Sequence, residues 1–246
     1  MTGTPTLLLT RPAEASERFA AQLRGVLGAR TPKVLIAPLM RLDYAGRLPE
    51  MTRVAGLIFT SANGVRAYAV AGGPRDLPAW AVGDATAEAA RRAGIPARAA
   101  GGDARALLDL MVRERPPGPL LHVRGEHARG DVARKLRVAG LDTRETVLYR
   151  QILLPLGDAA RAALDGRAPV VVPLFSPRTA VQFATQHGGR APLLVAAMSE
   201  AVAREVAHLP AVRLLTAERP DAPAMLRAVV ALLDHAARLE GPETDG

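Results

Sequence analysis

The sequence predicts an α/β protein built from two similar parallel-sheet domains. Three observations lead to this prediction. Short apolar runs of four to six residues alternate with stretches of helical period. The runs are continuously apolar, as in parallel strands that helices cover on both faces. A series of motifs also occurs twice in the same order. The chain has 246 residues, enough for one large domain or two small ones with cores of their own.

Ten apolar runs are predicted as strands, and helices are expected between them. The strands are expected at Thr6–Thr10, Val34–Ala37, Ala55–Thr60, Trp80–Val82, Ala97–Ala99, Leu120–Val123, Thr146–Leu153, Val170–Leu174, Leu193–Ala197 and Arg213–Leu215. The helix that begins at Pro12 places Phe19, Leu23 and Val26 on one apolar stripe, and the last helix carries a broader stripe from Met225 to Leu233. Both stripes indicate packing against a sheet.

The internal comparison indicates a duplication. Three pairs of segments match in order and spacing: Phe59–Val65 with Leu174–Ala180, Ala81–Ala87 with Ala197–Ala203, and Asp103–Leu108 with Asp221–Leu226. The first copy continues into Leu121–Gly125, and the match for that segment is Leu8–Pro12, at the other end of the chain.

One flavodoxin-like domain is therefore expected to be continuous, at about 40–147. The other is assembled from 1–36 and 152–246. Segments 34–42 and 146–154 are expected to be the two crossings between the domains, and we expect a cleft between the domains.

Composition excludes several classes of protein. The chain has no Cys, so it has no disulfide framework, thiolate nucleophile, iron–sulfur cluster or Cys-ligated zinc. The N-terminal segment lacks a basic region, and its apolar run is too short for a signal peptide or a membrane span. A cytoplasmic protein is expected.

The formal net charge is +8 and is carried almost wholly by arginine, because Lys33 and Lys135 are the only lysines. Two interpretations compete. The excess reflects a GC-rich coding bias, or it serves an acidic partner, either nucleic acid or a polyanionic small molecule. Aromatic residues make up only 3% of the chain, which argues against nucleic acid because single-strand binders stack bases on aromatic rings.

Standard catalytic motifs are absent. The sequence has no dinucleotide fingerprint, phosphate loop, His-Glu-x-x-His zinc motif or Gly-x-Ser-x-Gly elbow. His122, Glu126 and His127 could suggest a metal, but their spacing matches no known ligand pattern and His122 falls in a predicted strand. We therefore do not expect a metal.

Predicted strands repeatedly end in small hydroxyl or glycine residues where a helix should begin. These ends are Thr60–Gly64, Gly83–Thr86, Ser176–Thr179 and Met198–Glu200. Helix capping explains each one alone, because Ser, Thr, Asp and Asn are preferred caps. The alternative is a ligand site, since ligands of open parallel sheets bind at the carboxyl ends of strands and helix N-termini bind anions. Two such rims would form a cleft for a multiply anionic molecule.

Two arginines and one tyrosine stand out by position. Arg11 and Arg124 occupy matching strand ends, where a guanidinium can pair with a carboxylate through two hydrogen bonds. Tyr149 lies in a connector segment, so its hydroxyl either reaches the cleft or packs at an interface.

An ordered series of segments extends over nearly the whole chain: Leu9–Pro12, Leu57–Val65, Ala81–Ala87, Leu121–Gly125, Val147–Arg150 and Phe175–Pro177. This series resembles the uroporphyrinogen-III synthase family. The resemblance implies two α/β domains on a two-stranded connector and a lyase without cofactor. Its substrate is hydroxymethylbilane, a linear tetrapyrrole with eight carboxylates. Enzymes of the family close this linear tetrapyrrole to uroporphyrinogen III, with loss of water and inversion of ring D, in heme biosynthesis. A monomer is expected, with transient contact to the preceding pathway enzyme.

The resemblance also implies roles for residues. Tyr149 would act as general acid or hydrogen-bond donor at the departing hydroxyl. The residues that would hold carboxylates are Arg11, Thr60, Ser61, Asn63, Gly83, Thr86, Arg124, Gly125, Ser176, Arg178 and Ser199. The sequence departs from the family at Val202, where a threonine is usual, and Ser199 is then a candidate cap instead.

Two alternatives remain open. A non-catalytic two-lobed protein that binds a polycarboxylate metabolite would share the architecture, with Tyr149 merely packed in the hinge. Nucleic-acid binding is the weaker one, and a strongly salt-dependent affinity for DNA would favour it.

Overall fold

A computed structural model describes residues 4–127 and 130–239 of the chain. The chain divides into two compact units: unit 1 takes in residues up to Arg41 and from Leu153 onward, and unit 2 runs from Leu42 to Ile152. Each unit contains a mostly parallel sheet with helices on both faces, which confirms the predicted α/β fold class. No helix in the described part of the chain is long and apolar enough to cross a membrane.

Unit 2 is built on a six-stranded sheet with the order β3-β8-β7-β4-β5-β6. Its strands are β3 (Met40–Asp43), β4 (Gly56–Phe59), β5 (Ala79–Ala81), β6 (Ala97–Ala99), β7 (Leu120–Gly125) and β8 (Thr143–Leu153). The pairs from β8 to β6 are all parallel. β3 is not among the ten predicted strands, although it overlaps the connector segment predicted at 34–42. It runs antiparallel to β8, because Leu154 N–H donates to Leu39 O at 2.8 Å while Arg150 contacts Asp43.

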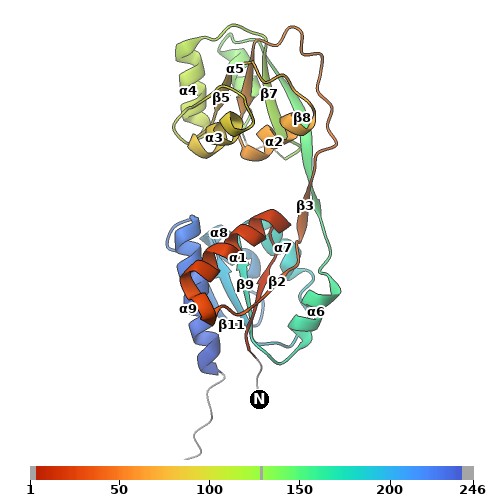
Figure 1. Cartoon of the computed structure of the whole chain (residues 1–246), viewed down its shortest axis with the longest axis vertical. Coiled ribbons are helices and arrows are strands. Elements are labelled where there is room, and N and C mark those ends of the chain that lie inside the picture. The colour runs from red at the N-terminus through yellow and green to blue at the C-terminus, as the bar shows by residue number, and fades with distance from the viewer. Residues whose placement is uncertain (1–3, 128–129, 240–246) are drawn as a thin grey trace, which may run out of the picture. The chain divides into compact units, whose positions relative to one another are not determined.

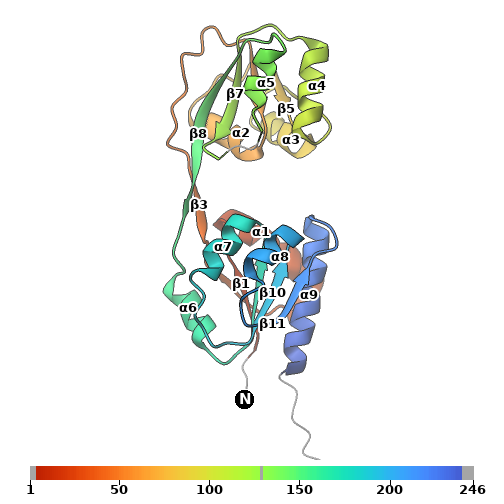
Figure 2. The ribbon, with the colours of Figure 1, turned by 180° about the vertical axis from the view of Figure 1, so that it is seen from behind.

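Two helices cover each face of the unit 2 sheet (Figures 1 and 2). On one face, α2 (Ala62–Val70) and α3 (Asp84–Arg92) share a buried cluster with strand residues that include Phe59. On the other face, α4 (Ala104–Glu114) and α5 (Val132–Val138) pack against Ile58 and its neighbours. This burial on both faces explains why the strands are continuously apolar.

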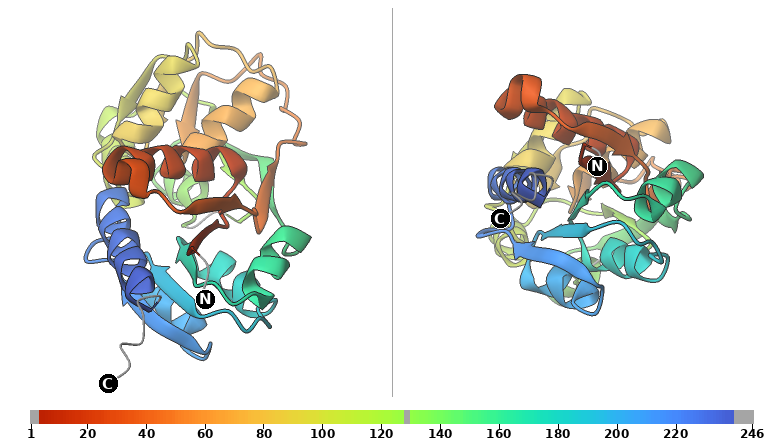
Figure 3. Two further views of the ribbon diagram at one scale, coloured as in Figure 1. Left: turned by 60° about the horizontal axis from the view of Figure 1, so that its bottom comes forward. Right: turned by 90° about the horizontal axis from the view of Figure 1, so that it is seen from below.

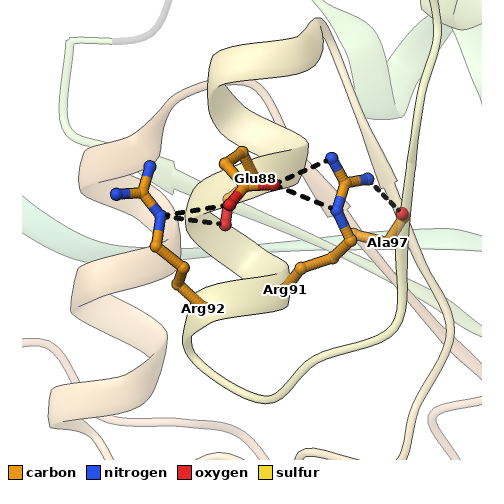
Figure 4. A network of polar contacts seen from close by, with 4 residues as sticks. All are labelled: Glu88, Arg91, Arg92 and Ala97. Atoms are coloured by element: carbon orange, nitrogen blue, oxygen red, sulfur yellow. Dashed lines mark hydrogen bonds and ion pairs between the residues drawn. The ribbon is translucent and has the colours of Figure 1, made fainter.

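The exposed side of α3 carries a small polar network (Figure 4). Glu88 pairs with Arg91 at 3.2 Å and with Arg92 at 3.5 Å. Arg91 also donates to the carbonyl of Ala97 at 2.9 Å, which ties the helix to β6. These side chains are largely exposed, so the pairs add only about 0.2–1 kcal/mol each.

Unit 1 is built on a five-stranded parallel sheet with the order β11-β10-β9-β1-β2. Its strands are β1 (Thr6–Leu9), β2 (Lys33–Ile36), β9 (Val170–Leu174), β10 (Leu193–Ala197) and β11 (Ala211–Thr216). One face is covered by α1 (Ala13–Leu27), which continues into the short η1 (Gly28–Arg30), and by α9 (Ala222–Leu239). The other is covered by α6 (Asp158–Asp165), α7 (Pro177–Ala184) and α8 (Glu200–Val206). Figure 3 shows the strands between these two helix layers.

The predicted stripe of α1 is wrong in one position. Phe19 and Leu23 are buried, but Val26 is 59% exposed, and Leu27 takes its place in the core at 7%. Leu27, four residues after Leu23, lies on the helix face that packs against the sheet. Val26, three residues after Leu23, lies on the side turned away from it.

The two sheets have the same strand order. β9, β10 and β11 correspond to β4, β5 and β6, and the N-terminal strands β1 and β2 occupy the places of β7 and β8. This arrangement agrees with the internal comparison of the sequence, which matched the segment around β1 to that around β7.

Each sheet has one topological switch point. In unit 2 the chain leaves β4 through α2 on one face and leaves the adjacent β7 through α5 on the other. In unit 1 the same reversal occurs between β9, followed by α7, and β1, followed by α1. Ligands of open α/β sheets bind at the carboxyl ends of strands at such points, so the residues at these two switch points are candidates for a binding site.

Candidate active site

The switch point of unit 2 brings Ser61 and Tyr149 together. Ser61 follows β4 and caps α2, where its Oγ accepts from Gly64 N–H at 3.1 Å. Tyr149 lies in β8, and its hydroxyl oxygen is 3.0 Å from Ser61 Oγ. Because Ser61 Oγ already accepts one hydrogen bond, its own O–H can donate a hydrogen bond to the phenol oxygen. The phenol proton is then available to a ligand.

Gly125 provides the space in which the ring of Tyr149 lies. The two residues are paired in the sheet just after an irregularity in β7, between Arg124 and Gly125. A Cβ at position 125 would lie 2.7 Å from two ring carbons of Tyr149 and 3.0 Å from its hydroxyl oxygen. Any side chain here would therefore displace the tyrosine. Tyr44 contacts the same ring, with 6.3 Å between the ring centroids.

Thr60 and His122 form a second pair at this switch point. Thr60 comes directly after β4, and its Oγ1 is 3.3 Å from Nε2 of His122 in β7. His122 is 1% exposed, and its Nδ1 is buried without a partner among the described residues. Burial lowers the pKa of His122 to about 4, with a raising effect from Glu145 and a lowering effect from Arg124. The ring is thus neutral near neutral pH.

Arg124 is held by its own chain. Its Nη1 donates to the carbonyls of Gly125 and Glu126 at 3.0 and 3.2 Å, and its Nη2 donates to Glu145 Oε1 at 2.9 Å. The Nε is buried without a partner in the described residues. This guanidinium therefore fixes the end of β7 and supplies positive charge there, and it would bind a carboxylate through two hydrogen bonds only after leaving these partners.

An open hollow of about 280 Å³ lies beside Tyr149 in unit 2. Its lining includes Asp43, Gly46, Glu126, Val147, Tyr149 and Arg150. Arg150 pairs with Asp43 at 2.8 Å, and Glu126 N–H donates to the carbonyl of Tyr149 at 3.0 Å. Tyr149 therefore has open space on one side and the Ser61 hydroxyl as its partner.

The switch point of unit 1 places an arginine on an aromatic ring. The guanidinium carbon of Arg11, just after β1, lies 4.2 Å from the ring centroid of Phe175, just after β9. Phe175 in turn contacts Phe19 edge to face. Burial lowers the pKa of Arg11, and Arg18 adds to the effect. Ser176, which follows Phe175 in the sequence, caps α7 by accepting from Thr179 N–H at 3.3 Å.

The remaining predicted binding residues lie at the starts of helices. Asn63 and Arg178 are in the first turns of α2 and α7, and Gly83 precedes α3. A Cβ on Gly83 would come within 3.2 Å of Gly102 Cα, so glycine permits this close approach of two loops. Thr86 is only 6% exposed, which leaves little of its side chain for a ligand.

The capping interpretation holds at two of the four strand ends. Ser61 and Ser176 cap their helices through their side chains. Ser199 occupies the N-cap position of α8, as the sequence suggested, but makes no side-chain capping bond. Val202 is 1% exposed and packs in the apolar core of unit 1. An apolar residue suits that position.

Sequence reasoning missed several partners of the site. Phe175 and Tyr44 were detectable as rare aromatic residues beside motif positions. The link from His122 to Thr60 and the ion pair of Glu145 with Arg124 had no local signal, because they depend on the pairing of β7 with β4 and β8. Within residues 4–127 and 130–239, no group of three or more His, Asp or Glu side chains could hold a metal ion.

Three comparisons with known proteins were informative to different degrees. The family described as uroporphyrinogen-III synthase HemD matches residues 21–227. A structure of uroporphyrinogen-III synthetase from Helicobacter pylori is similar, with a TM-score of 0.63, 18% identity and coverage of 81% of this chain and 92% of that one. A mutant synthase structure from Thermus thermophilus gives a TM-score of 0.48 at 17% identity, covering 96% and 99% of the two chains. A search of curated proteins found no match.

Proposed function

Because the chain belongs to the uroporphyrinogen-III synthase family, whose members serve heme biosynthesis, we propose that it converts hydroxymethylbilane to uroporphyrinogen III. The reaction breaks the bond between the terminal methylene carbon and its hydroxyl, which leaves as water after accepting a proton. The methylene carbon then bonds to ring D, and rearrangement through a spiro intermediate inverts that ring. A pyrrole carbon loses the balancing proton when the macrocycle closes.

The pair of Tyr149 and Ser61 carries this proposal. A hydroxide is a poor leaving group, so a proton donor at the departing oxygen speeds the step. Tyr149 is the general acid in this proposal: its hydroxyl stands 3.0 Å from Ser61 Oγ, and the residue lines an open hollow. Ser61 supports the phenolate that forms, because its hydroxyl can donate to that oxygen and stands at the N-terminus of α2.

The substrate's carboxylates are proposed to bind at the carboxyl edges of the sheets. In unit 1, Arg11 is a half-buried cation stacked on Phe175 beside the start of α7. In unit 2, Thr60 and the N-terminus of α2 supply hydroxyl and N–H donors. The substrate also cyclises without the enzyme to the isomer whose ring D is not inverted. Holding the chain in the conformation for inversion can lower the barrier by about 7–11 kcal/mol in favourable cases.

The test is the isomer ratio of the product. Purified protein is given freshly generated hydroxymethylbilane, and the uroporphyrins are separated after oxidation, against a sample without protein. We expect predominantly type III. Type I alone, at the spontaneous rate and with folded protein, would overturn the proposal and leave a passive polycarboxylate-binding protein.

Two tyrosine variants test the acid. Tyr149→Phe keeps the ring and removes the hydroxyl, so kcat should fall about 100-fold or more while KM changes little. Tyr44→Phe is the matched control, because the Tyr44 hydroxyl has no partner in the described residues. Its kcat should stay within about twofold of wild type. A normal kcat for Tyr149→Phe would refute the acid role and leave the synthase activity standing.

A further inference from the structure

The buried imidazole of His122 has a role to explain. Its Nε2 is 3.3 Å from Thr60 Oγ1, and within residues 4–127 and 130–239 this is its one hydrogen-bonding contact. The ring lies in the middle of β7, in register with Ile58, beside an apolar cluster. A polar group with only half of its hydrogen bonds made is less stable in a core than an apolar side chain of similar size. Stability therefore does not account for a histidine here.

The position of the proton on this ring follows from its surroundings. The ring is neutral near neutral pH, so one nitrogen carries hydrogen and the other accepts. A proton on Nδ1 would leave a buried N–H without an acceptor, and orphaned N–H groups are rarer in proteins than orphaned acceptors. We therefore assign the proton to Nε2, which donates it to Thr60 Oγ1.

This bond decides what the threonine hydroxyl can do. Because Nε2 of His122 is the donor in this hydrogen bond, the Thr60 hydroxyl cannot donate to it. The Thr60 O–H is therefore available to a different acceptor. Thr60 is half-buried at the switch point and makes no other side-chain hydrogen bond in the described part of the chain. It follows Phe59, which pairs with Val123, so its strand neighbour is Arg124. The Arg124 guanidinium is paired with Glu145 at 2.9 Å and still attracts an anionic acceptor more than a cationic group.

We propose that His122 is a positioning residue that directs the Thr60 hydroxyl proton toward a substrate carboxylate at the unit 2 switch point. The proposal rests on the proposed function for the identity of the ligand. It predicts that the imidazole acts only through Thr60, so the two side chains should behave as one in binding.

A double-mutant cycle tests this coupling. Thr60→Val should raise KM for hydroxymethylbilane about 10-fold and leave kcat within about twofold, because a hydrogen bond to a charged group is lost. His122→Leu should raise KM about fivefold, and the double variant should match Thr60→Val alone. His122→Gln, whose amide N–H can replace Nε2–H, should restore most of the affinity. If His122 were only structural, the two effects would multiply to about 50-fold.

The control is Thr143→Val, which removes a buried hydroxyl at the opposite end of the sheet. Thr143 is 1% exposed and donates to Leu141 O at 3.1 Å. This variant should lose stability without a change in KM. Multiplicative effects of the Thr60 and His122 variants, or failure of His122→Gln to rescue a folded protein, would overturn the proposal.

Two further readouts separate this proposal from the synthase activity. Dissociation constants for uroporphyrin, a stable fluorescent molecule with eight carboxylates, report binding without turnover and should follow the same cycle. Long-range ¹H–¹⁵N NMR spectra should show His122 protonated on Nε2. Coupled binding without type III product would support His122 while the proposed function fails. Type III product from a protein with His122 protonated on Nδ1 would support the proposed function and overturn the proposal for His122.

Discussion

Replacing Gly125 with alanine tests whether the position of Tyr149 sets the reaction rate. The added Cβ would lie 2.7 Å from two ring carbons of Tyr149. Carbon atoms prefer about 3.5–4.0 Å, so the ring must retreat by roughly 0.8 Å or more. The retreat also displaces the hydroxyl from its present position, 3.0 Å from Ser61 Oγ. A displacement of about 1 Å at a reacting group can cost about 100-fold in rate.

We therefore expect Gly125→Ala to lower kcat about 100-fold and to change KM less than about threefold, measured as the rate of type III formation. Overpacking should also lower the free energy of unfolding by about 1–3 kcal/mol, and circular dichroism checks that the variant is folded. Gly157→Ala is the matched control, because nothing lies within 4 Å of a Cβ there. Its rate should equal that of wild type.

A second comparison identifies the cause of the loss. In a Tyr149→Phe background the acid is already absent, so adding Gly125→Ala should lower kcat by less than about twofold. A folded Gly125→Ala protein with wild-type kcat would refute the reasoning. So would a full additional loss in the Tyr149→Phe background, since Gly125 would then act through something other than the tyrosine.

Three further predictions concern stability and ionisation. Gly25→Ala, at an exposed position inside α1 with nothing within 4 Å of the new Cβ, should raise the free energy of unfolding in urea by about 0.5–1 kcal/mol. Folding lowers the pKa of His122 from 6.5 to about 4. The contribution of the neutral ring to the free energy of unfolding is therefore complete above pH 6.5 and is lost as pH falls toward 4. Urea unfolding should show this histidine-dependent loss, about 3 kcal/mol, in wild type and not in His122→Leu. Trp80→Phe removes the indole donor that, more than Arg98, lowers the pKa of Glu114, so an NMR titration should show this pKa higher than in wild type.

The sequence predicted strands best where both faces of the sheet are covered. Val170–Leu174 and Leu193–Ala197 are continuously apolar because helices bury every residue in them. The apolar pattern did not indicate β3, because Met40–Asp43 forms the edge of its sheet and includes the charged residues Arg41 and Asp43. An edge strand needs little apolar surface, so its sequence resembles that of a loop.

The candidate site was predictable only in part, for a different reason. Strand ends such as Thr60 and Ser61 were visible because capping and turn residues follow apolar runs. Their partners lie 62 and 88 positions away, at His122 and Tyr149. Those contacts depend on how β4, β7 and β8 align, and no local pattern specifies that register. The roles of these residues as ligands of the substrate stay predictions.

The strand order of unit 1 affects how the protein folds during synthesis. β1 pairs on one side with β9, and roughly 160 residues separate Leu9 from Val170. At about 5–20 residues per second, the ribosome needs roughly 10–30 s to make that stretch. Unit 2, which is one continuous segment, emerges complete within this time. Until β9 has been synthesised, β1 can pair only with β2, and its other edge stays unpaired. During this time the nascent chain exposes an apolar segment to which chaperones can bind and which the folded protein buries.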